Sequence, residues 1–283
     1  MNNLSIVDAH IHLWDINHLS YPWLDSVPKI KRNYLIEDYD QATENCEIES
    51  MVFVQAACLS EQFLDELSWI QSIADKDNRL KGIVPWAPMH LGEGVEDTLR
   101  IFQKDSRIKG VRQLIQGEKK ADFCCSEEFV AAVQLLAKYD LHFELTVDVD
   151  QFPDVMKLIE QCPDTQFILD HIGNPNIEKG QLTPWDEYLR VFARSGNHYC
   201  KFSNFVCNAN LDHWKTEDLK PFAEVVIDVF GVDRLIWASD WPHALRASSW
   251  QRWFETSLEL TRDFNSQEHD SFFNKNAMKF YRL

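Results

Sequence analysis

Eight short apolar runs recur along the chain, separated by longer stretches of mixed polarity, and this alternation constrains the fold more than any other feature. Apolar runs of this length, bounded by polar residues, are typical of buried strands in a parallel sheet. The expected strands are Leu4–His10, Met51–Gln55, Gly82–Trp86, Gly110–Leu114, Leu141–Val147, Gln166–Asp170, Tyr199–Ser203 and Leu235–Ser239.

The stretches between these runs carry apolar residues at three- and four-residue spacing, which predicts helices. The expected helices are Glu61–Asp75, Glu127–Tyr139, Phe152–Gln161, Leu219–Phe230, Trp250–Phe264 and Gln267–Tyr281. Strands that alternate with helices form parallel β-α units, and eight units in 283 residues predict an α/β protein with a (β/α)8 TIM-type barrel.

A doubly wound open sheet is the competing architecture for the same pattern. Such sheets usually carry a glycine-rich phosphate turn between a strand and a helix, whereas the one Gly-x-Gly here, Gly92–Gly94, lies outside any expected turn of that kind. The sequence also shows no linker, low-complexity segment or strong repeat. We therefore expect one barrel domain over residues 1–283.

The charge balance excludes several kinds of partner. Lys and Arg total 28 and Asp and Glu total 45, giving a net charge of −17, which disfavours nucleic acids and anionic membranes. No apolar run approaches the ~20 residues of a membrane span, and the N-terminus lacks the features of a signal peptide. The seven cysteines form no C-x-x-C pair, which favours a reducing, cytoplasmic location. A homo-oligomer is left open.

Polar side chains that suit catalysis follow three of the expected strands. His10 and His12 end the first strand, His171 follows the sixth, and Asp240 follows the eighth. Because the carboxyl ends of barrel strands share one face, we expect these residues to converge there.

His10 and His12 are two residues apart, so on a strand both rings point to one side and can bind one metal ion. The alternative is one ligand-like histidine beside a satisfied polar partner. Glu144, in the middle of the fifth strand, is the candidate third metal ligand, because a carboxylate inside a barrel is costly unless it is paired or metal-bound. It could equally form a salt bridge with Arg112 or Lys201.

Asp240 is the candidate general acid/base; as the alternative, it caps the next helix. His171 is a second candidate catalytic residue, unless it is only a buried hydrogen-bonding side chain. Its neighbour Asp170 should point away from the barrel axis if strand alternation continues. Arg112 should project inward, either to polarise a substrate carbonyl or to balance the acidic residues. Lys201 is interpreted as structural or supporting.

Several aromatic residues near the expected strand ends are candidates to wall a substrate pocket, although each would equally serve as core packing. A long aromatic segment between residues 13 and 34 is the candidate lid. The candidate substrate-binding residues are Trp14, Trp23, Gln55, Trp86 and Trp241.

The motifs VDAHIHLWD, YPWL, VFVQA, KGVRQLIQ, FELTVD, FILDHIGNP, YCKFSN and DRLIWASDWP run through the whole chain. Together they resemble the amidohydrolase superfamily, and within it the amidohydrolase-2 group of sugar-lactone hydrolases such as L-fuconolactonase and L-rhamnonolactonase. One motif departs from the group: the usual Lys-Leu-Ser-Gly is here Lys201-Phe202-Ser203-Asn204. The absence of this glycine makes the identity of the substrate less certain than the type of reaction.

The resemblance implies a metal-dependent-hydrolase-like barrel that opens a sugar-derived (aldono) lactone, a small-molecule substrate. It places His10 and His12 in the first-strand pair, His171 as the sixth-strand histidine and Asp240 as the eighth-strand acid. Members of the group differ in whether they need a divalent metal, so zinc and metal-independent action both stay open. Two alternatives also stay open. One is a related hydrolase or decarboxylase that clamps a carboxylate substrate with Arg112; the other is a non-catalytic sugar-binding barrel.

Overall fold

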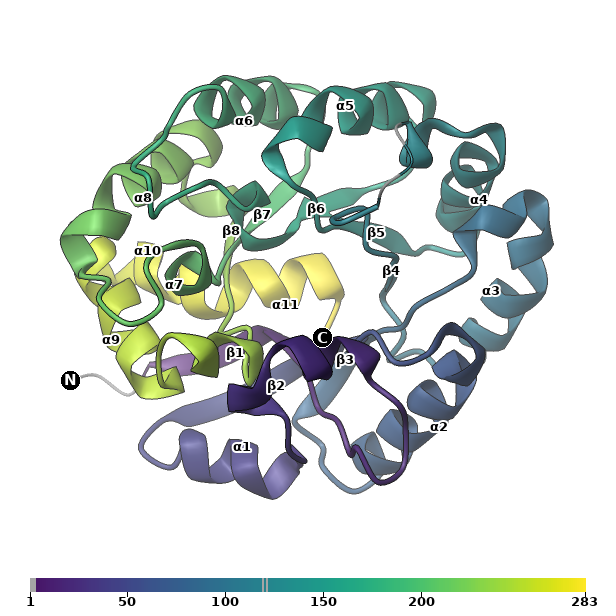
Figure 1. Ribbon diagram of the computed structural model, residues 1–283, viewed down its shortest axis with the longest axis horizontal. Helices are drawn as coiled ribbons and strands as arrows, with labels where there is room; N and C mark the ends of the chain where they lie inside the picture. Colours follow the sequence, from purple (N-terminus) through teal and green to yellow (C-terminus); the bar gives the residue numbers. More distant parts are fainter. Residues whose placement is uncertain (1–3, 119, 121) are drawn as a thin grey trace.

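A computed structural model describes residues 4–118, 120 and 122–283. All eight expected strands are present, and their ends differ from the expected ends by a few residues at most. Strands occupy the centre of the molecule and helices surround them (Figure 1). The strands are β1 (Ser5–Ile11), β2 (Glu47–Val54), β3 (Leu80–Val84), β4 (Gly110–Arg112), β5 (His142–Leu145), β6 (Phe167–Leu169), β7 (Tyr199–Phe202) and β8 (Leu235–Trp237).

The helices confirm most of the expected positions. Those present are α1 (Ile36–Ala42), α2 (Phe63–Ala74), α3 (Glu96–Phe102), α4 (Glu127–Lys138), α5 (Phe152–Gln161), α6 (Trp185–Arg194), α7 (Phe205–Asn208), α8 (Thr216–Phe230), α9 (Trp250–Leu260), α10 (Ser266–Asp270) and α11 (Asn276–Tyr281). The sequence pattern did not single out α1, α3, α6 or α7. The expected helix over Gln267–Tyr281 is divided, because a π-helical segment, Ser271–Lys275, separates α10 from α11.

The strands are all parallel, but they form two sheets instead of the expected continuous barrel. One sheet has the order β1-β2-β3 and the other the order β4-β5-β6-β7-β8. Single parallel bridges join them, Ile83 to Ile108 at one seam and Ile11 to Trp241 at the other. Backbone hydrogen bonds also cross each seam, from Lys109 N–H to the Ile83 carbonyl oxygen at 3.0 Å and from His12 N–H to the Trp241 carbonyl oxygen at 2.7 Å, without forming a regular ladder.

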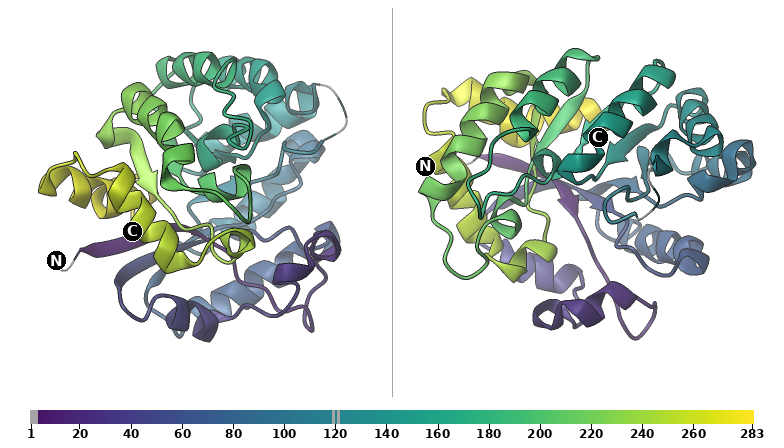
Figure 2. Two further views of the ribbon diagram at one scale, coloured as in Figure 1. Left: turned by 60° about the vertical axis from the view of Figure 1, so that its left-hand side comes forward. Right: turned by 45° about the horizontal axis from the view of Figure 1, so that its top comes forward.

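The sheets enclose an apolar interior that α11 covers. Small and branched side chains from β1, β2, β3, β6 and β8 pack with Tyr199 of β7 and with Phe280 and Tyr281 of α11. The turned views in Figure 2 show the last helices alongside the strands, in yellow. With one end of the strands filled by α11, the opposite ends are left to form a site.

The helices pack their apolar faces around the sheets and bury a second, larger core. Within the described ranges, no helix combines the length and apolarity that crossing a bilayer requires. All seven cysteines are free thiols.

Candidate active site

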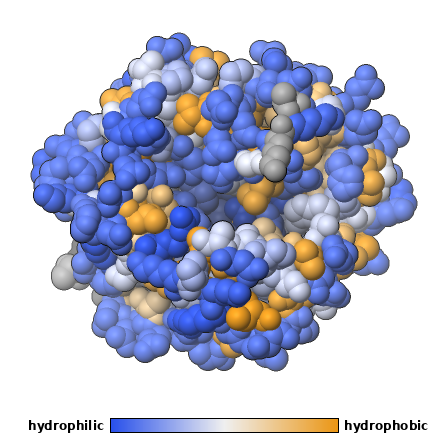
Figure 3. Space-filling model, in the orientation of Figure 1, coloured by the Kyte–Doolittle hydropathy of each residue, from blue (hydrophilic) through white to orange (hydrophobic). Residues whose placement is uncertain are grey.

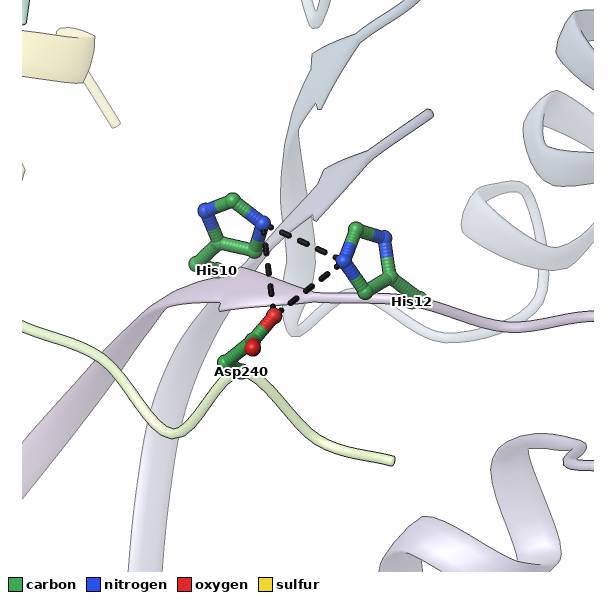
Figure 4. Close-up of side chains that lie close together, drawn as sticks. All are labelled: His10, His12 and Asp240. Atoms are coloured by element: carbon green, nitrogen blue, oxygen red, sulfur yellow. Dashed lines mark hydrogen bonds and ion pairs between the residues drawn. The ribbon is translucent and has the colours of Figure 1, made fainter. Parts of the chain in front are cut away.

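Three side chains from the two ends of the chain meet at the carboxyl ends of β1 and β8 (Figure 4). His10 Nε2 lies 3.2 Å from His12 Nε2, and Asp240 Oδ1 lies 3.6 Å and 3.2 Å from these two nitrogens. Asp240 Oδ1 is buried and has no hydrogen-bond partner within the described chain. The predicted meeting of the first-strand pair with the eighth-strand acid is therefore present in the structure.

A local irregularity of β1 turns the histidine pair inward. Val7 and Ala9 belong to the interior cluster, so strict alternation would send His10 and His12 to the outside. The register against β2 shifts between Asp8 and Ile11, and such a bulge reverses the side to which later residues point.

Asp8, on the outer side of β1, joins this strand to the segment that carries Asp240. Its Oδ1 accepts from the backbone N–H of Ser239 at 2.9 Å, and its Oδ2 accepts from Tyr39 Oη and Trp250 Nε1, each at 2.9 Å. Asp240 follows Ser239 directly and its own backbone N–H donates to the His10 carbonyl oxygen at 3.0 Å. The distance between acid and imidazoles is thus fixed from both strands.

The neighbours of His12 fix its tautomer, whereas those of His10 do not. His12 Nδ1 donates to the Val54 carbonyl oxygen at 2.7 Å, which leaves the Nε2 lone pair facing the site. His10 has a cation at each ring nitrogen, with Lys201 Nζ 2.9 Å from Nδ1 and Arg112 Nη1 3.3 Å from Nε2. Both cations can only donate, so either nitrogen of His10 can serve as the acceptor.

Burial keeps His10, His12 and His171 neutral near pH 7. Burial, and then the Lys201 ammonium, hold the pKa of His10 well below its ordinary value, and burial also lowers the pKa of His12. Burial lowers the pKa of His171 to about 4. Asp240 shows the opposite balance: burial alone would raise its pKa, but His171 and His243 hold it well below the ordinary range, so it is ionised.

A buried cluster of charged side chains lies beneath His10, His12 and Asp240. Lys201 Nζ donates to Glu144 Oε2 at 2.6 Å and lies 3.0 Å from Asp170 Oδ1. Arg112 Nη1 is 3.5 Å from Asp170 Oδ2 and 3.3 Å from His10 Nε2, while Nη2 donates to the Gln55 carbonyl oxygen at 2.5 Å.

The cluster corrects two expectations. Glu144 is not brought to the histidine pair: Lys201, His142 and Tyr281 Oη surround its oxygens, so of its two expected roles the structure shows the salt bridge with Lys201. Asp170 does not point away from the axis, because it continues the inward set to which Ile168 belongs. The groups whose ligand atoms lie close enough for a cation are His10, His12 and Asp240, and His10, Asp170 and His171.

His171 reaches the same pocket by a different route. It lies outside the strand, in a turn where its φ is +52° and that of Ile172 is +53°, both left-handed. Its Nδ1 lies 2.8 Å from Ser203 Oγ, and its Nε2 lies 3.9 Å from Asp240 Oδ1. The backbone reversal, rather than strand alternation, brings this ring inward.

His243 is a site residue that the sequence reading missed. Its Nδ1 lies 2.8 Å from Asp240 Oδ2, and Arg246 Nη1 donates to its Nε2 at 2.9 Å. Because the guanidinium only donates, Nδ1 bears the proton directed at Asp240. A histidine three residues after Asp240, in the turn that follows β8, was the available signal.

A cavity of about 250 Å³ opens above these residues, near the ~300 Å³ lower limit for small-molecule sites. Figure 3 shows this face hollowed near its middle, with mostly hydrophilic residues in the hollow. The lining residues are His12, Trp23, Ala56, Ala57, Arg112, Leu114, Gln116, Thr146, His171, Asn204, Asp240 and His243.

Of the expected substrate-binding residues, Trp23 alone is among the lining residues. Trp14 and Trp241 are fully buried and pack edge-to-face against Tyr34, and Trp86 packs against Phe63. The Gln55 side chain bonds to the backbone N–H of Ala57 at 2.6 Å. These four therefore shape the surroundings of the pocket without lining it.

Comparison with known proteins agrees with this geometry. A family model described as amidohydrolase matches residues 7–283, so the chain belongs to the amidohydrolase family, and the expectation of an enzyme of the hydrolase class is confirmed. It is 23% identical to an L-fucono-1,5-lactonase of Burkholderia ambifaria over 98% of this chain and 95% of that protein. It is also 23% identical to an L-rhamnono-gamma-lactonase of Scheffersomyces stipitis over the full length of both.

The fold is shared with a crystal structure of an amidohydrolase from Burkholderia multivorans that contains bound zinc. The two chains superimpose with a TM-score of 0.88 over 99% of each chain, at 23% identity. The expected resemblance to this family is thereby confirmed at the level of fold.

Proposed function

We propose that this protein hydrolyses the ester bond of a sugar-derived lactone by directing a water molecule at the ring carbonyl. The observation that carries the proposal is Asp240 Oδ1, a buried, ionised carboxylate oxygen without a hydrogen-bond partner, facing a small cavity beside two neutral imidazoles. A buried carboxylate oxygen without a hydrogen bond is costly unless it accepts a proton or binds a ligand. The names of the lactonase relatives support the choice of substrate.

In this proposal Asp240 accepts a proton from the attacking water and later donates it to the departing ring oxygen. The His243 N–H at Oδ2 keeps Oδ1 turned toward the cavity. Arg112 and His171 line the pocket and offer donors for the negative charge that develops on the carbonyl oxygen. Trp23 forms one wall of the cavity.

The three ligand atoms of His10, His12 and Asp240 fit a divalent cation. Their separations of 3.2 to 3.6 Å are close to the ~3.3 Å expected between ligands that sit ~2.0–2.1 Å from a tetrahedral zinc ion. A bound cation would polarise the carbonyl and lower the pKa of water, and the family neighbour with bound zinc supports this assignment. Binding through His10 Nε2 requires the lone pair on that nitrogen and the proton on Nδ1, where Lys201 Nζ lies 2.9 Å and Asp170 Oδ1 3.5 Å away.

The two sheets would then be halves of one (β/α)8 barrel in a single domain.

The alternative function is a hydrolase or decarboxylase that acts on a carboxylate substrate, and the experiment below distinguishes it from a lactonase. Arg112 is already held by Asp170 and the Gln55 carbonyl, which weakens its use as a carboxylate clamp.

The deciding experiment is a panel of unphosphorylated aldonolactones and matched cyclic carboxylates, assayed for acid release and carbon dioxide against the uncatalysed rate. The protein is tested as purified, after chelation, and after return of zinc, manganese or magnesium. We expect lactone opening, with Asp240→Asn lowering kcat by about 100-fold or more while the circular dichroism spectrum stays unchanged. Exposed Asp228→Asn serves as the matched control.

Near-normal turnover by the Asp240 variant would overturn its role. Carbon dioxide release from a carboxylate would show that the substrate is a carboxylate and not a lactone. Lactone binding without turnover, under any metal condition, would favour a sugar-binding protein.

A further inference from the structure

Asn204 follows β7 at the rim of the cavity and holds an unusual backbone conformation. Its φ is 58° and its ψ is 16°, in the left-handed region. Glycine is the default residue there, and asparagine is among the few others that tolerate it. The chain therefore keeps a backbone shape suited to glycine and adds a carboxamide that glycine would lack.

The carboxamide is buried but unused. Asn204 is 5% exposed, and Oδ1 has no hydrogen-bond partner. No side-chain hydrogen bond of Asn204 is found among the residues that the structure describes, although its backbone carbonyl accepts from Cys207 at 3.1 Å. Leaving a buried polar group unsatisfied costs about 1–3 kcal/mol, so the group is expected to have a partner in the working protein.

Outside the proposed catalytic residues, the other polar side chains around the cavity are already engaged. Thr146 Oγ1 donates to Asp170 at 2.7 Å, and Gln116 Nε2 donates to Asp148 at 2.8 Å. His243 is held between Asp240 and Arg246. His12, Arg112, His171 and Asp240 belong to the proposed catalytic set, and the remaining walls are Trp23, two alanines and Leu114. Outside the catalytic set, Asn204 is thus the buried polar wall residue left to meet a ligand.

Its position also relates it to the reacting groups. The preceding residue, Ser203, contacts His171 Nδ1 at 2.8 Å, and both Asn204 and His171 line the cavity with Asp240. A ligand whose carbonyl faces Asp240 would present another part of its ring to Asn204.

We infer that Asn204 forms a binding subsite for ring hydroxyl groups of the substrate, with Oδ1 accepting from one hydroxyl and Nδ2 donating to the same or an adjacent one. A free acceptor beside a free donor matches the hydroxyls of an aldonolactone and has no counterpart on an unsubstituted lactone. This inference rests on the proposed function and makes it more specific: the enzyme selects a polyhydroxylated lactone.

The test compares the ratio of kcat/KM for a hexono-1,5-lactone over δ-valerolactone, which lacks ring hydroxyls, in the native protein and in Asn204→Gly. Glycine keeps the left-handed backbone and removes only the carboxamide. We expect the ratio to fall about 10- to 100-fold, the range for losing one partner of a buried hydrogen bond. Asn204→Asp keeps the acceptor and loses the donor, so its ratio of kcat/KM values should lie between those of the native protein and Asn204→Gly.

Exposed Asn197→Gly, just before β7 at the other end of the strand, is the matched control and should leave the ratio unchanged. An unchanged ratio in Asn204→Gly, or an equal loss on both lactones, would overturn the subsite while leaving lactone hydrolysis intact.

A binding measurement separates failure of the subsite from failure of the proposed function. The dissociation constants of a hexono-1,5-lactam and of δ-valerolactam are measured by calorimetry with the same variants. If no lactone is opened but Asn204→Gly still weakens the hydroxylated lactam selectively, the subsite holds and the hydrolytic function is wrong. If the native protein shows no preference for the hydroxylated lactam, the subsite is overturned whatever the catalytic result.

Discussion

At the scale of single residues, Lys201 supports the site without lining its cavity. Its three N–H donors face three acceptors: Glu144 Oε2 at 2.6 Å, His10 Nδ1 at 2.9 Å and Asp170 Oδ1 at 3.0 Å. The ammonium compensates two buried carboxylates and at the same time contacts a ring nitrogen of His10. A change at this residue alters both the stability of the fold and the chemistry of the site.

Replacing Lys201 with Met should lower the free energy of unfolding at pH 7 by about 3–5 kcal/mol, because Glu144 and Asp170 are left as uncompensated buried charges. Urea denaturation measures the loss. The control is Lys157→Met, an exposed lysine paired with Asp154 on α5, which should cost less than about 1 kcal/mol. A loss below about 1 kcal/mol for Lys201→Met would show that the cluster does not need this cation.

At the scale of elements, α2 carries an acid into the wall behind the cavity. Glu66 is 2% exposed, and its Oε1 accepts from the backbone N–H of Ala56, a lining residue, at 3.2 Å. Burial raises its pKa to about 7, against the opposing effects of the Ala56 hydrogen bond and of Arg112. Helix α2 therefore contacts the segment after β2 through the Glu66 carboxyl group, and folding favours the protonated form of this group.

Because the folded-state pKa lies above the unfolded value of about 4.5, the native protein loses stability as the pH rises between these two values. Glu66→Gln cannot ionise and should escape this loss. Relative to the native protein, the variant should gain up to about 3 kcal/mol in free energy of unfolding between pH 4.5 and pH 8. Urea denaturation at both pH values tests this, with exposed Asp65→Asn on the same helix as control. An equal pH dependence in Glu66→Gln and the native protein would contradict the assignment.

At the scale of the whole molecule, the net charge of −17 opposes compactness. Surface carboxylates outnumber their basic partners, so the folded chain repels itself, and salt screens this repulsion as the Debye length shortens from ~30 Å at 0.01 M to ~8 Å at 0.15 M. The surface ion pairs, such as Arg190 with Asp228, contribute too little attraction to offset this net repulsion.

The melting temperature should therefore rise when sodium chloride is increased from about 10 to about 150 mM, because screening stabilises the compact state. Differential scanning calorimetry measures the change, and potassium chloride at the same concentrations should give the same shift. A melting temperature that is unchanged or falls would mean that specific ion pairs outweigh the net repulsion.

The sequence by itself determined the strands, most of the longer helices and the face on which the site lies. These depend on hydrophobic periodicity and on the shared direction of parallel strands, both of which are local or follow from chain order. The same rule placed His10, His12 and Asp240 at one end of the strands, whereas the inward turn of the histidine pair depends on the bulge in β1.

Only the tertiary structure decided which way the remaining polar residues point and what they meet. The bulge in β1, the left-handed residues at His171 and Asn204, and the pairing of Lys201 with Glu144 and Asp170 depend on register and on neighbours distant in sequence. Periodicity carries no information about these, because one extra residue or one positive φ reverses the direction of a side chain without changing the pattern of apolar residues.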